Sequence, residues 1–269
     1  MADPRFLETL QERVLLGDGA YGTEFLRRGC MPGRPLDELN LTRPELVAEL
    51  HREYVSAGSQ LTKTNTFLAN RFRLESHGLG DRVREINQAG VRLAREAARG
   101  GLVAGVIGPL TECRWADRTA TYQEQCAALA EAGCDLFLLE TFMEASDLLA
   151  AVEVGRQTGL PLVCEMALTL ERGFDRLALY GGKKGPSVLG TNCVDPEQAL
   201  RSIERMARSC ALPLAAFPSA GRPGEEKSPP EFAEAIVDLV KAGARLVGGC
   251  CGTGPAHIRA AAAALGERA

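Results

Sequence analysis

The sequence predicts an α/β protein, a single-domain (β/α)8 TIM barrel that spans residues 1–269. Three observations support this prediction. Short apolar segments alternate with segments of helical periodicity, eight such units fit into the length of the chain, and polar residues and cysteines follow the apolar segments directly. Near-continuous apolar strands that alternate with amphipathic helices indicate a parallel sheet covered by helices. Eight units in this length favour a closed barrel over an open sheet.

The predicted strands are short runs rich in Val, Ile, Leu and Phe. In chain order they cover residues 14–16, 59–62, 102–107, 136–139, 162–164, 188–190, 214–217 and 246–248. Helical spacing of apolar residues, often with Pro in the first turn and Gly after the last, predicts helices such as 44–57, 81–98, 144–158, 196–209 and 229–242. Residues 171–185 are rich in glycine and predict a shortened unit after the fifth strand.

Composition and charge exclude several classes of function. The net charge is -4 and the pI about 5.6, which gives no basic field for nucleic acid or anionic lipid. No apolar run approaches the roughly 18 to 20 residues that span a bilayer, and the N-terminus does not resemble a signal peptide. Nine cysteines, an odd number, argue against an extracellular disulfide framework. We therefore expect a cytoplasmic protein that binds neither nucleic acid nor membrane.

Three cysteines follow two of the predicted strands. Cys193 ends the sixth strand, and Cys250 and Cys251 follow the eighth between glycines. Alternate strands of a sheet lie roughly 9 to 10 Å apart, so these side chains can converge on one ion at the barrel mouth. Three thiolates favour a soft or borderline metal such as Zn²⁺ and leave its fourth position open. From spacing alone, this metal site and a set of buried core cysteines are equally well supported; for the other six cysteines we predict core packing.

Several motifs resemble the homocysteine S-methyltransferase family. The C-terminal sequence 248–253, Gly-Gly-Cys-Cys-Gly-Thr, resembles the cysteine signature of that family, and Thr191-Asn192-Cys193-Val194 resembles its other cysteine motif. Residues 15–24, 105–109 and 139–142 resemble its first, third and fourth strand ends. The segment 64–67, Thr-Asn-Thr-Phe, resembles the motif that follows the second strand in the barrel of cobalamin-dependent methionine synthase. The resemblance runs in order from about residue 12 to residue 264.

The resemblance implies a zinc-dependent S-methyltransferase of methionine biosynthesis. One Zn²⁺ per chain would be held by Cys193, Cys250 and Cys251, which are also the catalytic residues. The thiol of homocysteine would bind the zinc as a thiolate at the C-terminal rim of the barrel and attack a methyl donor. Asp18, Gly19, Glu140 and Asn65 are the implied substrate-binding residues. Without the resemblance, Asp18 is better explained by an ordered turn and Glu140 by a helix N-terminus.

The sequence does not identify the methyl donor. The chain leaves no room for a corrinoid domain after the barrel, so methylcobalamin would have to arrive on a separate corrinoid protein, whereas sulfonium or ammonium donors could enter directly. Lys63 and Ser219 depart from the family pattern around the pocket, which leaves another thiol as an alternative acceptor. Alternative functions are a non-catalytic zinc- or thiol-binding partner subunit and, less well supported, a phosphate-binding TIM-barrel lyase.

Two further patterns are weak. Gly17-x-Gly19-x-x-Gly22 matches a dinucleotide-binding fingerprint, but the next strand does not end in the acidic residue that such a site requires. The three histidines, His51, His77 and His257, do not have metal-ligand spacing, and we predict surface or structural roles for them.

Overall fold

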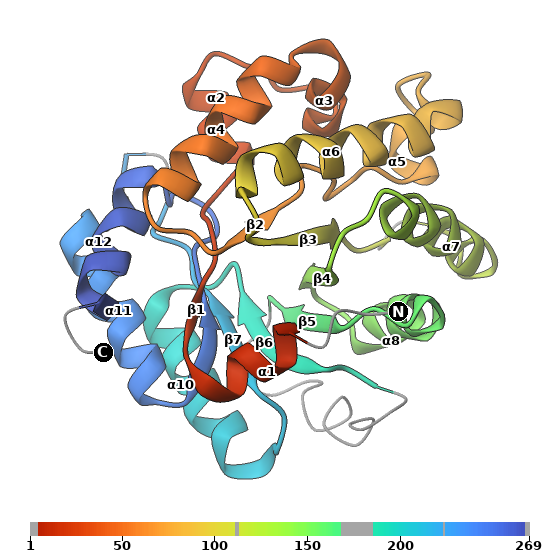
Figure 1. Ribbon diagram of the computed structural model, residues 1–269. Helices are drawn as coiled ribbons and strands as arrows, with labels where there is room; N and C mark the ends of the chain where they lie inside the picture. The colour runs from red at the N-terminus through yellow and green to blue at the C-terminus, as the bar shows by residue number, and fades with distance from the viewer. Residues whose placement is uncertain (1–4, 111–112, 168–184, 223, 267–269) are drawn as a thin grey trace.

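A computed structural model of the chain describes residues 5–110, 113–167, 185–222 and 224–266. Within this part, eight strands form one parallel sheet in the order β1-β8-β7-β6-β5-β4-β3-β2, and helices surround it (Figure 1). The backbone N–H of Gln60 donates to the carbonyl of Leu16 at 2.7 Å, and Gly17 pairs with Leu61. Strand β1 thus meets β2 as well as β8, the sheet closes, and the predicted (β/α)8 barrel is confirmed.

All eight predicted strands are present. They are β1 (Leu15–Leu16), β2 (Leu61–Lys63), β3 (Leu102–Ile107), β4 (Leu136–Phe142), β5 (Leu162–Met166), β6 (Val188–Asn192), β7 (Leu214–Phe217) and β8 (Ala244–Val247). Strands β4, β5 and β6 run further than predicted, because the parallel pairing continues through polar residues at which the apolar pattern stops. These added residues, among them Glu140, Glu165 and Asn192, reach the C-terminal mouth of the barrel.

Helices lie in the connections that the structure describes between the strands. The α-helices are α1 (Arg5–Glu12), α2 (Gly22–Arg27), α3 (Leu39–Thr42), α4 (Pro44–Ser56), α5 (Arg71–Glu75), α6 (Val83–Ala98), α7 (Trp115–Glu131), α8 (Ala145–Gly155), α10 (Pro196–Ser209), α11 (Pro229–Lys241) and α12 (Pro255–Gly266). Short 3-10 helices cover η1 (Leu36–Glu38), η2 (Gly80–Arg82) and η3 (Arg156–Thr158). Four α-helices begin with Pro, whose missing N–H has no role in the first turn. Asp195 caps α10 by accepting from the N–H of Gln198, so local sequence sets where this helix begins.

The core has two layers. One lies inside the barrel and the other between the sheet and the surrounding helices. Inside the barrel, Phe6 and Leu10 of α1 pack against the first residues of the strands and close the N-terminal end. Near the other end the ring of Phe217 fills the interior; a Cβ on Gly17 would lie 2.7 Å from it. The interior is therefore packed with side chains, and the open end of the barrel is the C-terminal one.

Two further expectations concern the segment 171–185 and the absence of a membrane-spanning helix. The shortened unit predicted at 171–185 lies, except for Gly185, outside the described residues. Among the helices that the structure describes, none combines the length and the apolar character needed to cross a membrane.

Candidate active site and metal centre

The three cysteines of the predicted metal site meet at the C-terminal end of the barrel. Cys193 follows β6, and Cys250 and Cys251 follow β8. Their Sγ atoms all lie within 4.8 Å of one another, and those of Cys193 and Cys251 are 3.7 Å apart. Tetrahedral zinc–thiolate bonds of about 2.3 Å set two sulfurs about 3.8 Å apart. The spacing of the thiols therefore fits a single zinc ion.

The backbone at the cysteines departs from strand geometry, which lets the side chains converge. Cys193 has a φ of 57°, in the left-handed region that non-glycine residues seldom adopt. Strand β8 ends at Val247, so Cys250 and Cys251 lie beyond the pleat that would send them to opposite faces. The N–H of Cys250 donates to the carbonyl of Pro218 at 2.9 Å and so joins the loop after β8 to the loop after β7.

The chemistry of the cluster also suits zinc. Cys251 is exposed, whereas Cys193 and Cys250 are half-buried. Hydrogen bonds from the thiols of Cys193 and Cys250 lower the pKa of Cys251 against the opposing effect of burial, whereas hydrogen bonds with the other two thiols, and then burial, raise the pKa of Cys250. Three thiolates match a borderline ion, and three protein ligands leave one tetrahedral position for another molecule.

A cavity of about 460 Å³ opens beside the cysteines. This volume is within the range of small-molecule sites. Its wall includes all three cysteines, together with Glu140 and Asn65 from the predicted substrate-binding set. The other two members of that set, Asp18 and Gly19, do not line the cavity; they lie next to Ala20 and Tyr21, which do. The structure thus brings the thiols and two of the four predicted substrate residues to one cavity.

A lysine lies between two acids at the floor of this cavity. The Nζ atom of Lys63 is 3.7 Å from Oδ1 of Asp18 and 3.8 Å from Oε2 of Glu140. Burial raises the pKa of Asp18 to about 6, with the charge of Lys63 opposing the rise, and burial likewise raises the pKa of Glu140. Burial alone would lower the pKa of Lys63, but the charges of Glu140 and Asp18 outweigh it. These three groups therefore form a charged cluster beneath the pocket.

Asp18 is held by a second set of contacts that the sequence did not indicate. Its Oδ2 atom accepts hydrogen bonds from the hydroxyl of Tyr21 at 2.6 Å and from the N–H of Lys63 at 2.8 Å. The same hydroxyl is 2.8 Å from Nδ1 of His51. Because the hydroxyl donates to Asp18, His51 must carry its proton on Nδ1 and donate. Burial lowers the pKa of His51 to about 3, which keeps it neutral. His51 is thus structural, as predicted, but it supports the acid cluster.

Glu165 is another acid that sequence reasoning missed. It belongs to β5, is 0% exposed, and has no hydrogen bond to either carboxylate oxygen within the described residues. Burial, and then the charge of Glu140, raise its pKa well above the ordinary value. A predicted strand that ended at Cys164 hid this residue, since an acid after an apolar run is typical of a loop. Its place next to Glu140 extends the acidic side of the charged cluster into the barrel.

Gly19 and Asn65 have structural contacts of their own. A Cβ on Gly19 would lie 2.6 Å from the carbonyl of Thr253 and 2.8 Å from the ring of Tyr54, so close packing requires glycine at this position. The Nδ2 atom of Asn65 donates to the carbonyl of Leu36 and to Oδ1 of Asn40. Both residues therefore hold neighbouring segments in place beside the site: Gly19 the segment at Thr253, and Asn65 the segment at Leu36 and Asn40.

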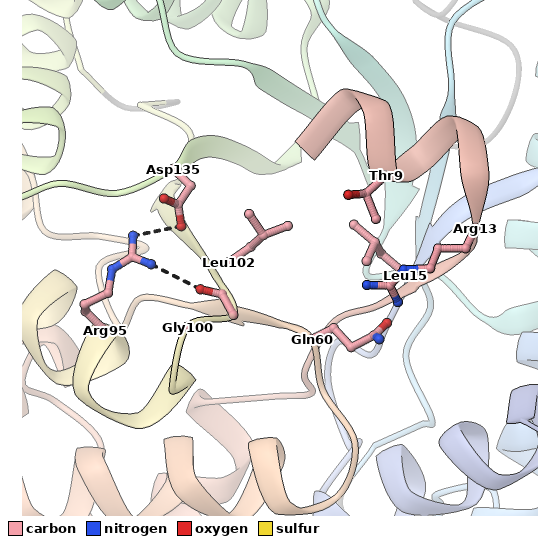
Figure 2. A pocket seen from close by; sticks show the side chains of 9 residues that line it. Thr9, Arg13, Leu15, Gln60, Arg95, Gly100, Leu102 and Asp135 are labelled. Atoms are coloured by element: carbon pink, nitrogen blue, oxygen red, sulfur yellow. Dashed lines mark hydrogen bonds and ion pairs between the residues drawn. The ribbon is translucent and has the colours of Figure 1, made fainter. Parts of the chain in front are cut away.

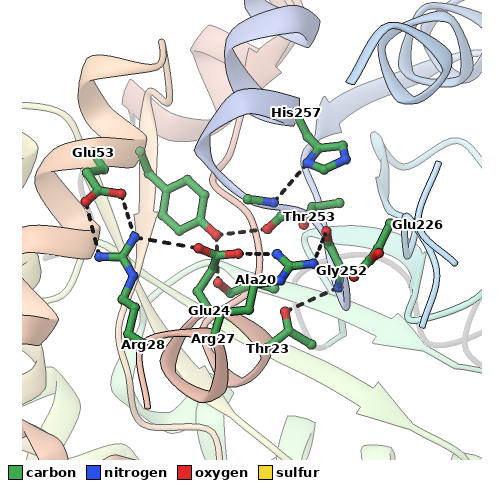
Figure 3. Close-up of polar contacts among 12 residues, drawn as sticks. Ala20, Thr23, Glu24, Arg27, Arg28, Glu53, Glu226, Gly252, Thr253 and His257 are labelled. Atoms are coloured by element: carbon green, nitrogen blue, oxygen red, sulfur yellow. Dashed lines mark hydrogen bonds and ion pairs between the residues drawn. The ribbon is translucent and has the colours of Figure 1, made fainter. Parts of the chain in front are cut away.

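A polar network holds the loop that carries Cys250 and Cys251 (Figure 3). Arg27 of α2 lies against Glu24, forms an ion pair with Glu226 in the loop after β7, and donates to the carbonyl of Gly252 at 3.5 Å. The N–H of Gly252 donates in turn to the hydroxyl of Thr23. Because Gly252 follows Cys251 directly, α2 fixes the position of the double-cysteine loop.

A separate cavity of about 390 Å³ lies at the N-terminal end of the barrel (Figure 2). Its lining includes Leu15 and Leu102, which begin β1 and β3, and the cationic side chain of Arg95. Arg95 already bonds to Asp135 at 2.8 Å and to the carbonyl of Gly101 at 3.1 Å. With its cation engaged and the cysteines at the opposite end, this cavity is not a candidate for the same chemistry.

The other six cysteines, together with His77 and His257, lie outside the cluster of three thiols. Cys30, Cys113, Cys126, Cys134 and Cys164 are buried and Cys210 is half-buried. Nδ1 of His257 accepts the N–H of Gly254, and His77 is exposed. Ser219, one of the departures from the family pattern, lies in the loop after β7, and its backbone N–H donates to the carbonyl of Val194, next to Cys193, at 2.8 Å.

Comparison with known proteins identifies a family and several similar chains. The family model described as homocysteine S-methyltransferase matches residues 15–265. Methionine synthases of Mycobacterium tuberculosis and Mycobacterium leprae are 31% and 32% identical to the chain over 98% of its length. The chain spans only about a quarter of the length of these relatives, 25% in both cases.

Solved structures give a similar result. The metallated form of the homocysteine methyltransferase MmuM from Escherichia coli superposes with a TM-score of 0.83 at 28% identity, covering 93% of this chain and 96% of that one. Its oxidized form gives a TM-score of 0.85, also at 28% identity, over 98% and 99% of the two chains. Here the likeness covers nearly the whole of both chains.

Proposed function

The chain belongs to the homocysteine S-methyltransferase family, and from this we propose that it transfers a methyl group to the thiol of homocysteine and so forms methionine. The observation that carries the proposal is the cluster of three thiols, which opens on a cavity that the acid Glu140 also lines. The thiols suit the sulfur end of the acceptor and the acids suit its ammonium. Family membership favours this reaction over the phosphate-binding lyase alternative.

Cys193, Cys250 and Cys251 would hold one zinc ion, which supplies a Lewis acid strong enough to remove the proton of a coordinating thiol at neutral pH. An unassisted thiol, with a pKa near 8.5, is mostly protonated there. A metallated form of the MmuM neighbour has been solved, which supports a metal-dependent reaction for this chain. The protein contributes the placement of the ligands, because the loops after β6 and β8 bring them together.

The charged floor of the cavity would orient the acceptor. Glu140 lines the cavity, and its Oε2 atom has no hydrogen bond within the described residues. We assign to Glu140, with Asp18 behind it, the binding of the acceptor ammonium, and to Gly19 and Asn65 the shape of the adjoining wall. In the reaction the acceptor sulfur forms a bond to the methyl carbon, the donor loses its bond to that carbon, and the thiol proton leaves to solvent.

The test is methionine formation from homocysteine by the zinc-loaded, reduced protein. The donor panel holds methylcobalamin, S-methylmethionine, S-adenosylmethionine and betaine, with methylcobalamin also supplied on a separate corrinoid protein. Cys251→Ser is the blank, and Cys210→Ser, a cysteine away from the cluster, is the matched control. We expect turnover with one donor in the wild type and in the control, and none in the blank.

Two other outcomes distinguish the alternatives. Zinc binding without turnover on any donor would contradict the methyltransferase and support a zinc- or thiol-binding subunit. Turnover that persists in Cys251→Ser would contradict the assignment of the three cysteines.

A further inference from the structure

Lys63 supplies a cation to both acids at the floor of the cavity. Its Nζ atom is 3.7 Å from Oδ1 of Asp18, 3.8 Å from Oε2 of Glu140, and donates to the carbonyl of Gly249 at 3.2 Å. Neither of these carboxylate oxygens has a hydrogen bond within the described part of the chain. Glu140, which lines the cavity, and Asp18, which lies behind it, thus share a positive charge that comes from the protein itself.

The position of this lysine is well defined. Its side chain is 4% exposed, and Nζ lies 5.2 Å from the centre of the Phe217 ring. The backbone N–H of Lys63 also donates to Asp18, so both ends of the residue hold the same carboxylate. A buried ammonium without counter-ions would be strongly unfavourable, and so would two buried carboxylates without a cation. Lysine and acids therefore stabilise one another before any acceptor enters.

This arrangement changes what the pocket can discriminate. When a substrate supplies the only partner of buried polar groups, an analogue that lacks the partner group is rejected by about 10⁴- to 10⁵-fold, because those groups stay unpaired. Lys63 removes that penalty, because Asp18 and Glu140 keep a cation in either case. An acceptor ammonium is still tolerated, since two carboxylates outnumber one lysine.

We propose that Lys63 is a built-in counter-ion that widens acceptor specificity to mercapto carboxylic acids without an amino group. The simplest such acceptor is 4-mercaptobutanoate, which is homocysteine without its ammonium. The proposal rests on the proposed function, because it concerns the same pocket and the same transfer to sulfur. Lys63 is a specificity-determining residue here and takes no part in bond making.

The test compares the two thiols on the zinc-loaded protein. Dissociation constants from calorimetry and initial rates of methylation are measured for homocysteine and 4-mercaptobutanoate. In the wild type we expect the two thiols to bind within about tenfold of each other, because neither leaves the acids unpaired. In Lys63→Met we expect the preference for homocysteine to rise to about 100-fold or more. Arg34→Met is the matched control, since Arg34 also lines the cavity but pairs with Glu38.

The preference of the wild type for homocysteine over 4-mercaptobutanoate tests the proposal even if Lys63→Met does not fold. A preference of the wild type for homocysteine above about a thousandfold would overturn the proposal and leave the homocysteine methyltransferase standing. An unchanged ratio in folded Lys63→Met would overturn it as well. If the zinc-loaded protein binds and methylates neither thiol, the proposed function itself fails, and the role of Lys63 falls with it.

Discussion

The side-chain amide of Asn192 forms two hydrogen bonds with Thr141. Oδ1 accepts the backbone N–H of Thr141 at 2.9 Å, and Nδ2 donates to its hydroxyl at 2.8 Å. Thr141 has a φ of 65° and follows Glu140, whereas Asn192 precedes Cys193, which has a φ of 57°. One amide therefore links Thr141 near the end of β4, next to Glu140, to the residue of β6 that precedes Cys193.

Asn192→Ala is expected to weaken zinc binding by about 10- to 100-fold, because residues behind the ligands orient them. Thr141→Ala removes only the hydroxyl partner and keeps the backbone N–H, so its effect should be smaller. Zinc competition against a chromogenic chelator measures both. Equal zinc affinity in the wild type and in folded Asn192→Ala would show that the amide does not position Cys193.

Arg27→Met should also weaken zinc binding, by about tenfold, because the ties from α2 to Glu226 and Gly252 disappear. Arg27 is partly exposed, so the free energy of unfolding should change little. Arg28→Met is the control: Arg28 lies on the same turn but pairs mainly with Glu53. Similar losses in the two variants would argue for a general effect on α2 in place of a specific tie to the cysteine loop.

Gly17→Ala should destabilise the barrel by about 1–3 kcal/mol, because the added Cβ would lie 2.7 Å from the Phe217 ring. Phe217→Leu removes the ring atoms that clash, so the double variant should recover part of the loss. Urea unfolding of the two single variants and the double variant gives the coupling free energy. If the free-energy changes of the two single variants simply add in the double variant, the close approach of Gly17 to the Phe217 ring is contradicted.

Asp37, which lines the same cavity as the cysteines, gives a pH dependence of stability. Burial raises its pKa to about 6 from 3.8, with the N–H of Leu68 opposing the rise. Between these values the folded chain holds the proton more tightly than the unfolded chain, so this group favours folding less as pH rises from about 4 to 6. At pH 8, Asp37→Asn should be more stable than the wild type by about 1–3 kcal/mol.

Denaturant unfolding at pH 4 and at pH 8 checks this prediction. The gain of the asparagine variant should shrink at pH 4, where the folded wild type carries the neutral acid. A gain of the same size at both pH values would mean that Asp37 does not titrate as its burial implies.

The barrel and the meeting of the cysteines could be predicted from the sequence, because both depend on strong local patterns. Apolar runs mark the strands, and glycines around Cys250 and Cys251 mark the end of β8. In a parallel barrel all such ends share one rim, so the order of the motifs is enough to bring Cys193 beside them. The detailed register of the strands was not needed.

The buried contacts around Asp18 and Glu140 could not be predicted from the sequence. Glu165 lies inside the barrel although an acid after an apolar run is typical of a loop. His51 occupies an ordinary helical position in α4, and only the fold brings it to Tyr21. Lys63 was visible as a departure from the family pattern, but its ion pairs with Asp18 and Glu140 depend on side-chain directions across three strands. Such contacts are set by tertiary packing, which periodicity does not encode.

The central claim is that three cysteines hold zinc and leave one position for the thiol of the acceptor. Zinc K-edge X-ray absorption of the zinc-loaded protein, with and without homocysteine, tests it most directly. We predict three sulfur ligands at about 2.3 Å and one lighter ligand in the free protein, and four sulfur ligands after homocysteine is added. A set of ligands that does not change on adding homocysteine, or fewer than three sulfurs in the free protein, would contradict the account.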